Sequence, residues 1–169
     1  MILKPADILL WRVAPGAAWL PRLIGWAQDK LLHHPENAPD YYHVGMIAQD
    51  GISYYESIPP RVTKTDIDWP LPDYVEVYRL IIPPTQDQLK KMFSYAESLQ
   101  GKLYNVIGII SFGHIQIGDF PYCSQYVWRI CTQADILLCP WDELEGPDEI
   151  AASLKLMKVA DAGSTTIAA

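Results

Sequence analysis

Cys123 is the residue whose type and position most clearly suggest catalysis. It lies in the stretch DFPYCSQYVWRICTQA (119–134), directly before a run with helical periodicity. A thiol in the first turn of a helix is close to unpaired backbone N–H groups and to the positive end of the helix dipole, which favour the thiolate form. The same N–H groups could stabilise an oxyanion. The sequence therefore offers Cys123 as a candidate nucleophile.

The alternative for this cysteine is structural, because a cysteine is also a small apolar residue that packs well in a core. Helical spacing places Cys123 on one face together with Val127, Ile130 and Cys131. An isolated cysteine on such a face is usually a core residue, so the catalytic interpretation needs a second group.

A nucleophilic thiol needs a base, and His43 is the histidine that a predicted strand would hold in place. Two strand-like runs within residues 43–58 are joined by Asp50-Gly51, which is typical of a β-hairpin. With a two-residue turn, Glu56 lies opposite Gly45 and diagonal to His43, about 7–8 Å away on the same face. Gly45 leaves room for the two side chains to meet. The sequence thus predicts that Glu56 orients the imidazole.

The face that carries His43 and Glu56 is apolar, so we expect a helix to cover it. Its other members are Ile47, Ile52 and Tyr54. If the helix that begins at Cys123 is the cover, the three residues form a nucleophile, a base and an orienting carboxylate. The alternative is a surface His–Glu pair, and a one-residue bulge would reverse the assignment of faces.

The remaining elements predict an α+β fold with an antiparallel sheet packed against helices, because strands come early in the chain and helices late. Strands are predicted at 6–13 and 74–81, helices at 16–32, 85–101 and 123–138, a proline-rich connection at 59–73, and a loop followed by a short helix at 140–159. The run 104–113 is ambiguous between helix and strand. We expect one domain over residues 1–160 and a loose tail at 161–169.

Composition excludes several classes of protein. Half of the 169 residues are hydrophobic and 20% are charged, which is typical of a globular chain. The net charge of −7 argues against nucleic acid or an anionic membrane as a partner. No signal peptide or transmembrane segment is predicted, so we expect a cytoplasmic protein.

The spacing of the three cysteines argues against both a disulfide framework and a metal site. Cys123, Cys131 and Cys139 are eight residues apart, whereas a zinc site commonly uses closely spaced cysteine pairs. A zinc site formed by Cys123, Cys131 and a histidine is therefore disfavoured, and we expect free thiols. No phosphate-binding glycine motif is present. The sequence predicts neither a metal nor another cofactor.

Five short motifs occur in an order that resembles a known family. They are ADILL (6–10), YHVGMI (42–47), YYES ending at Ser57, GKLYN (101–105) and YCSQYV (122–127). In type and order they resemble the circularly permuted NlpC-type cysteine hydrolases, the YiiX-like group of papain-like folds. The resemblance covers roughly residues 5–160 and implies a papain-like fold in which the sheet and the histidine precede the cysteine helix. It also implies that Cys123 is the nucleophile, His43 the base and Glu56 the orienting group.

The sequence departs from the family pattern at several positions without losing any of these three residues. Ala6, Tyr42, Asn105 and Gln125 replace the Gly, Ser, Asp and acidic residue that are common there. These differences bear on the substrate more than on the chemistry.

Together, the residues and the resemblance predict a cysteine hydrolase that cleaves an amide bond through a thioester acyl-enzyme. The expected substrate is a small peptide, isopeptide or N-acyl amide. One alternative is an acyltransferase or lipid hydrolase of the lecithin–retinol acyltransferase kind, although the N-C-E-H context of those enzymes differs from PYCSQ (121–125). Another is a non-catalytic binding module on the same fold. Tyr41 or Tyr42 could supply a second oxyanion donor, and the sequence leaves this open, as it does the oligomeric state.

Overall fold

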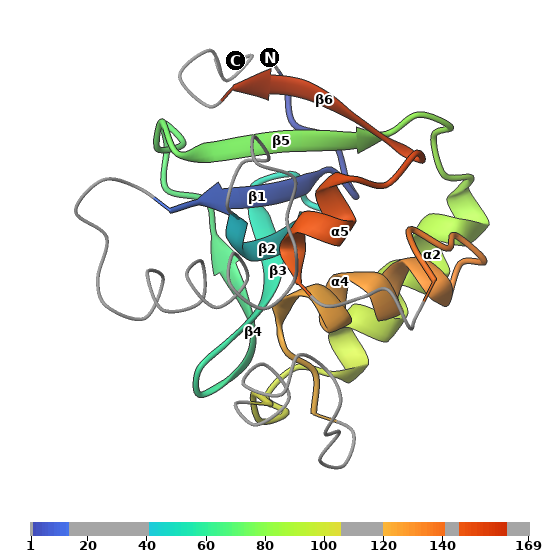
Figure 1. The fold of residues 1–169 in the computed structure, drawn as a ribbon. Coiled ribbons are helices and arrows are strands. Elements are labelled where there is room, and N and C mark those ends of the chain that lie inside the picture. Colours follow the sequence, from blue (N-terminus) through green and yellow to red (C-terminus); the bar gives the residue numbers. More distant parts are fainter. Residues whose placement is uncertain (1, 14–40, 106–119, 141–145, 162–169) are drawn as a thin grey trace.

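A six-stranded antiparallel sheet is the centre of the computed structural model, which describes residues 2–13, 41–105, 120–140 and 146–161 (Figure 1). The strands are β1 (Ile8–Arg12), β2 (Tyr41–Ile47), β3 (Ser53–Ile58), β4 (Arg61–Asp66), β5 (Val75–Leu80) and β6 (Leu156–Asp161), in the order β4-β3-β2-β1-β5-β6. The described helices are α2 (Gln86–Ser98), α4 (Cys123–Thr132) and α5 (Pro147–Ala151). This arrangement confirms the predicted α+β class with an antiparallel sheet.

The register of the β2–β3 hairpin agrees with the prediction, although its turn is wider. Gly45 lies opposite Glu56 and Ile47 opposite Tyr54. The expected two-residue turn is replaced by a loop closed at Ala48, whose N–H donates to the carbonyl of Ser53 (2.9 Å). The Asp50 carboxylate accepts the N–H groups of residues 52 and 53 at 3.0 and 2.9 Å, which stabilises the wider turn without changing the register.

The two edge strands of the sheet are absent from the prediction. β4 lies within the segment 59–73 that was expected to be a proline-rich connection, and β6 lies within and just beyond 140–159. The prolines of the first segment flank β4 and do not interrupt it, and an edge strand tolerates the alternating polar residues of RVTKTD. β6 extends to Asp161, so the loose tail expected from residue 161 onward is wrong at that residue; residues 162–169 lie outside the described part.

The helices begin where the sequence predicts. Thr85 caps α2, and its hydroxyl accepts the N–H of Gln88 in a capping box. The helix predicted over 123–138 begins at Cys123 but ends at Thr132, and Asp135 follows with a positive φ of 60°. The segment 16–32 lies outside the described residues, and so does 104–113 apart from Tyr104 and Asn105.

Two apolar clusters lie on the two faces of the sheet. One contains Val44, Met46 and Tyr55 of the sheet with α4 and part of α2. The other contains Ile47 with β5 residues, and Trp11 and Tyr54 pack against it. The central strands are thus buried on both faces, and α4 packs on β2 and β3 with α2 beside it (Figure 1).

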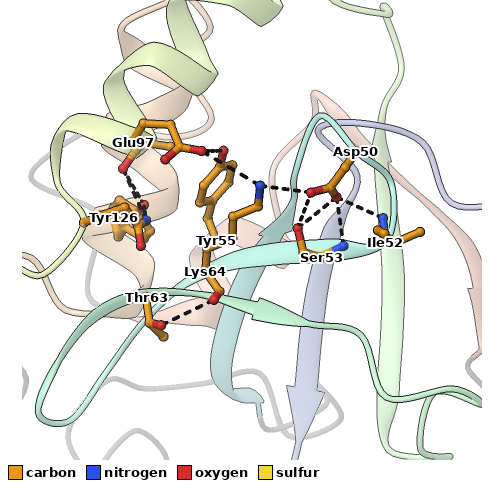
Figure 2. A network of polar contacts seen from close by, with 10 residues as sticks. Asp50, Ile52, Ser53, Tyr55, Thr63, Lys64, Glu97 and Tyr126 are labelled. Carbon is orange, nitrogen blue, oxygen red and sulfur yellow. Dashed lines mark hydrogen bonds and ion pairs between the residues drawn. The ribbon is translucent and has the colours of Figure 1, made fainter.

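A polar network connects the β2–β3 turn and β4 with α2. Lys64 of β4 forms an ion pair with Asp50 at 2.9 Å, and its ammonium is 4.0 Å from the carboxylate of Glu97 on α2 (Figure 2). The hydroxyl of Tyr55 donates to the same Glu97 carboxylate. These contacts attach α2 to the helix-covered side of the sheet.

Candidate active site

Cys123 is the first residue of α4, and its position is fixed by contacts of the residues just before it. Ser57 of β3 donates its hydroxyl to the carbonyl of Pro121 at 2.7 Å, which ties the start of the helix to the sheet. Tyr122 is the N-cap in an extended conformation, and its side chain makes no capping hydrogen bond to the helix. No side chain of the N-cap therefore competes for the first-turn N–H groups beside the thiol.

His43 and Glu56 form a buried hydrogen-bonded pair. His43 Nε2 lies 2.7 Å from Glu56 Oε2, and the two residues are 7% and 5% exposed. Glu56 engages Nε2, and Cys123 lies close enough to the same imidazole to raise the pKa of His43. Nδ1 is the ring nitrogen that Glu56 leaves available to the thiol. The three residues singled out in the sequence thus lie together.

The route by which they meet differs from the prediction. The body of α4 covers the opposite face of the sheet, where Val44 and Met46 lie, and not the face that carries Ile47 and Tyr54. Ile52, expected under the helix, is 66% exposed. The expectation failed because β2 is buried on both faces, so an apolar pattern could not say which face the helix covers. The described β2–β3 ladder ends at Gly45 and Glu56, and the first residue of α4 meets His43 beyond that end.

The charges within this group stabilise an imidazolium. Burial lowers the pKa of His43, but the hydrogen bonds and negative charges of Cys123 and Glu56 outweigh it and raise the pKa to about 9. For Glu56, burial raises the pKa, and the hydrogen bond and positive charge of His43 with further hydrogen bonds from Thr65 and Tyr54 lower it overall. At neutral pH the arrangement therefore favours a protonated His43 beside an ionised Glu56.

Burial alone does not distinguish Cys123 from the other cysteines, since all three are buried and none forms a disulfide. Their surroundings do. Burial raises the pKa of Cys131 to about 12, with no other cause contributing, as for a thiol in a core. Cys123, only 1% exposed, instead contacts an ionisable partner in His43.

Several residues around the pair were missed by the sequence analysis. Thr65 of β4 donates its hydroxyl to Glu56 Oε1 at 2.7 Å. The ring of Trp11 lies 4.9 Å from that of His43. Burial, followed by the nearby negative charge of Cys123, raises the pKa of Tyr104 well above its usual value, which places this tyrosine near the thiol. Thr65 lies on a strand that was not predicted; the GKLYN motif was the available signal for Tyr104.

Tyr41 is engaged away from the candidate site. Its hydroxyl donates to the buried carboxylate of Glu76 and lies 2.9 Å from the hydroxyl of Tyr78. Tyr41 is thus a packing residue of β2. The ring of Tyr42 stacks near that of His43, with 6.4 Å between centroids.

These features define an α+β protein with a buried cysteine, histidine and glutamate at one end of an antiparallel hairpin. No model of a known protein family matches the chain, and no curated protein sequence is significantly similar to it. Among solved structures, the crystal structure of the metalloprotein YiiX from Escherichia coli O157:H7 is similar, with a TM-score of 0.66 and 18% sequence identity. The alignment covers 95% of this chain and 98% of YiiX. The fold is therefore YiiX-like.

A membrane-spanning helix is not found in the described part of the chain. None of the helices there is both long enough and apolar enough to cross a bilayer.

Proposed function

We propose that this protein is a papain-like cysteine hydrolase that cleaves an amide bond, with Cys123 as nucleophile, His43 as acid and base, and Glu56 as the orienting group. The observation that supports this most strongly is the buried 2.7 Å bond between His43 Nε2 and Glu56 Oε2, with Cys123 at the imidazole. A carboxylate that fixes the ring while a thiol faces its other side is the arrangement that thiol catalysis requires. A core cysteine would need neither partner.

The chemical steps use only these residues, the substrate and water. The Cys123 thiolate attacks the amide carbonyl, a C–S bond forms, and the C–N bond breaks as the His43 imidazolium gives its proton to the leaving amine. Neutral His43 then takes a proton from water, and the resulting hydroxide attacks the thioester. Cleavage of the C–S bond releases a carboxylic acid and restores the thiolate and imidazolium.

Negative charge on the carbonyl oxygen needs hydrogen-bond donors. The backbone N–H of Cys123, in the first turn of α4, is the donor that we assign to this role. Tyr104 is a candidate for a second donor, because its phenol lies near the thiol. Tyr41 is not a candidate, since its hydroxyl is bound to Glu76.

A peptide, isopeptide or N-acyl amide is the substrate class that we propose. An acyltransferase would form the same acyl-enzyme but pass the acyl group to an acceptor other than water, so its product distinguishes it from a hydrolase. A lipid hydrolase would differ in the substrate that supplies the acyl group. A non-catalytic module would have no need for a polar triad in an otherwise apolar region, where burying polar groups costs free energy.

A library of peptide, N-acyl amide and ester substrates tests the proposal. We expect the wild-type protein to release amine or alcohol from some members and to carry the acyl group on Cys123, detected by mass spectrometry. Cys123→Ala should lose both signals, with turnover lower by at least about 10³-fold. Cys139→Ala is the matched control and should behave as wild type. Equal turnover by Cys123→Ala would contradict the assignment.

The name of the YiiX structure makes a metal-dependent protein the second candidate. In the described part of this chain, no group of three or more His, Cys, Asp or Glu side chains is suitably placed to hold a metal. The donors of this described part thus do not fit a metal, and we propose that the chemistry is metal-independent.

Removal of metal should therefore leave the thiol chemistry intact. After dialysis against EDTA, we expect the alkylation rate of Cys123 at pH 7 to stay within about twofold of its value before treatment. A large change that zinc reverses would support the metal-dependent alternative instead. Elemental analysis of the purified protein provides the control.

A further inference from the structure

Both oxygens of the Glu56 carboxylate have hydrogen-bond partners, and the partners come from different strands. Oε2 faces His43 of β2 at 2.7 Å, and Oε1 accepts the hydroxyl of Thr65 of β4, also at 2.7 Å. Thr65 lies opposite Tyr54 in the β3–β4 ladder, so it is diagonal to Glu56 on the same face. The central strand of the three thus presents a carboxylate that is held from both sides.

A carboxylate held at one oxygen alone would have freedom that this site restricts. The terminal torsion of a glutamate is broad and roughly two-fold, so a single hydrogen bond leaves the plane of the group poorly defined. A second hydrogen bond at Oε1 fixes that plane and directs Oε2 toward the imidazole. Supporting hydrogen bonds of this kind orient the groups that contact the reacting atoms.

We propose that Thr65 is a positioning residue, which holds the Glu56 carboxylate so that it orients His43 toward Cys123. This inference rests on the proposed function, because it assigns Thr65 a role through the same three residues. It requires no contact between Thr65 and the substrate.

Thr63, on the same strand and the same face, shows that a threonine there need not have this role. It lies directly opposite Glu56 in the ladder, yet its hydroxyl donates to the carbonyl of Lys64 at 3.5 Å and not to the carboxylate. The two threonines differ in their contact with Glu56, so one serves as the control for the other.

The pKa of the Glu56 carboxyl group depends on the groups that face it. They are His43 and Tyr42 from β2, Tyr54 from β3, Thr65 from β4 and, beyond the imidazole, Cys123 from α4. The hydrogen bond of Thr65 is one of the interactions that lower the pKa of Glu56 against the effect of burial. Removing it should therefore raise that pKa.

Three variants test the proposal: Thr65→Val, which keeps the shape and loses the hydroxyl, Thr65→Ser, which keeps the hydroxyl, and Thr63→Val. The first measurement is the pH titration of the Glu56 side-chain carboxyl carbon by NMR. We expect its midpoint to move to higher pH in Thr65→Val and to stay at the wild-type value in the other two. An unchanged midpoint in Thr65→Val, or an equal shift in Thr65→Ser, would overturn the proposal.

The second measurement is the rate of Cys123 alkylation across the same pH range. At pH 6, alkylation of Cys123 should be about 3- to 10-fold slower in Thr65→Val than in the wild type. This is the effect expected when a hydrogen bond to a charged group is misdirected. A thermal melt confirms that each variant is folded. If the carboxyl titration shifts but His43→Ala leaves alkylation unchanged, Thr65 holds the Glu56 carboxylate and the proposed function fails. If His43→Ala slows alkylation and Thr65→Val changes neither measurement, the function stands and the positioning role fails.

Discussion

Replacing His43 with alanine should slow alkylation of Cys123 by iodoacetamide at pH 6 by about 10- to 100-fold, because the thiolate loses its imidazolium partner. A cysteine without such a partner has a pKa of about 8.5 and is less than about 1% thiolate at pH 6. A protonated histidine beside a thiol favours the thiolate, although the intrinsic nucleophilicity of such a thiolate is lower. The expected ratio allows for both effects.

The pH dependence of this ratio has a defined sign. The pKa of His43 is raised to about 9, since the hydrogen bonds and charges of Cys123 and Glu56 outweigh burial. Below that pH the imidazole is protonated and supports the thiolate; above it the support is lost as the proton leaves. The wild-type protein should therefore exceed His43→Ala most strongly near pH 6, and the two rates should converge as the pH rises above about 9. A ratio that stayed constant across this range would exclude the ion pair.

The other two cysteines provide an internal reference when alkylation is mapped by mass spectrometry of the digested protein. Cys131 should resist alkylation until the protein is denatured, because burial raises its pKa to about 12. If Cys123 were also labelled only on denaturation, it would be a core residue at the start of α4. A binding role would then be the better interpretation of the fold.

The predictions that placed the candidate residues correctly are those that depend only on residues close together in the chain. The Asp50-Gly51 signal fixed the hairpin, and the opposition of Gly45 and Glu56 followed from strand alternation. The start of α4 followed from helical periodicity. Each of these depends on residues close together in the chain, and sequence reasoning handles such contacts well.

The contacts that the sequence could not supply are those between distant segments. β4 carries polar residues because it is an edge strand, so no apolar pattern marked it, and Thr65 was missed with it. The apolar pattern also could not predict which face of the sheet α4 covers, because Val44 and Ile47 are both buried although they lie on opposite faces. Only the packing of a helix on a doubly covered strand decides between them.

Gly45 shows how such packing changes a correct prediction. The sequence suggested that this glycine leaves space for His43 and Glu56 to meet. The nearest neighbours of an added Cβ are instead Cδ2 of Tyr54 at 3.0 Å, the carbonyl oxygen of Tyr55 at 3.0 Å and Cη2 of Trp11 at 3.4 Å. The space above the glycine is thus occupied by aromatic rings that pack beside the candidate site.

Gly45→Val should consequently lower the free energy of unfolding by about 1–3 kcal/mol, measured by urea denaturation, because a side chain must displace a backbone carbonyl and the partly buried ring of Tyr54. The backbone oxygen cannot move without disturbing the β2–β3 ladder next to Glu56, so alkylation of Cys123 should slow as well. Thr63→Val, at a more exposed position on the edge strand β4, is the control and should change stability by less than about 0.5 kcal/mol. Wild-type stability in Gly45→Val would mean that the Tyr54 ring and the hairpin shift without cost, and the close packing beside His43 would then have no part in holding the site together.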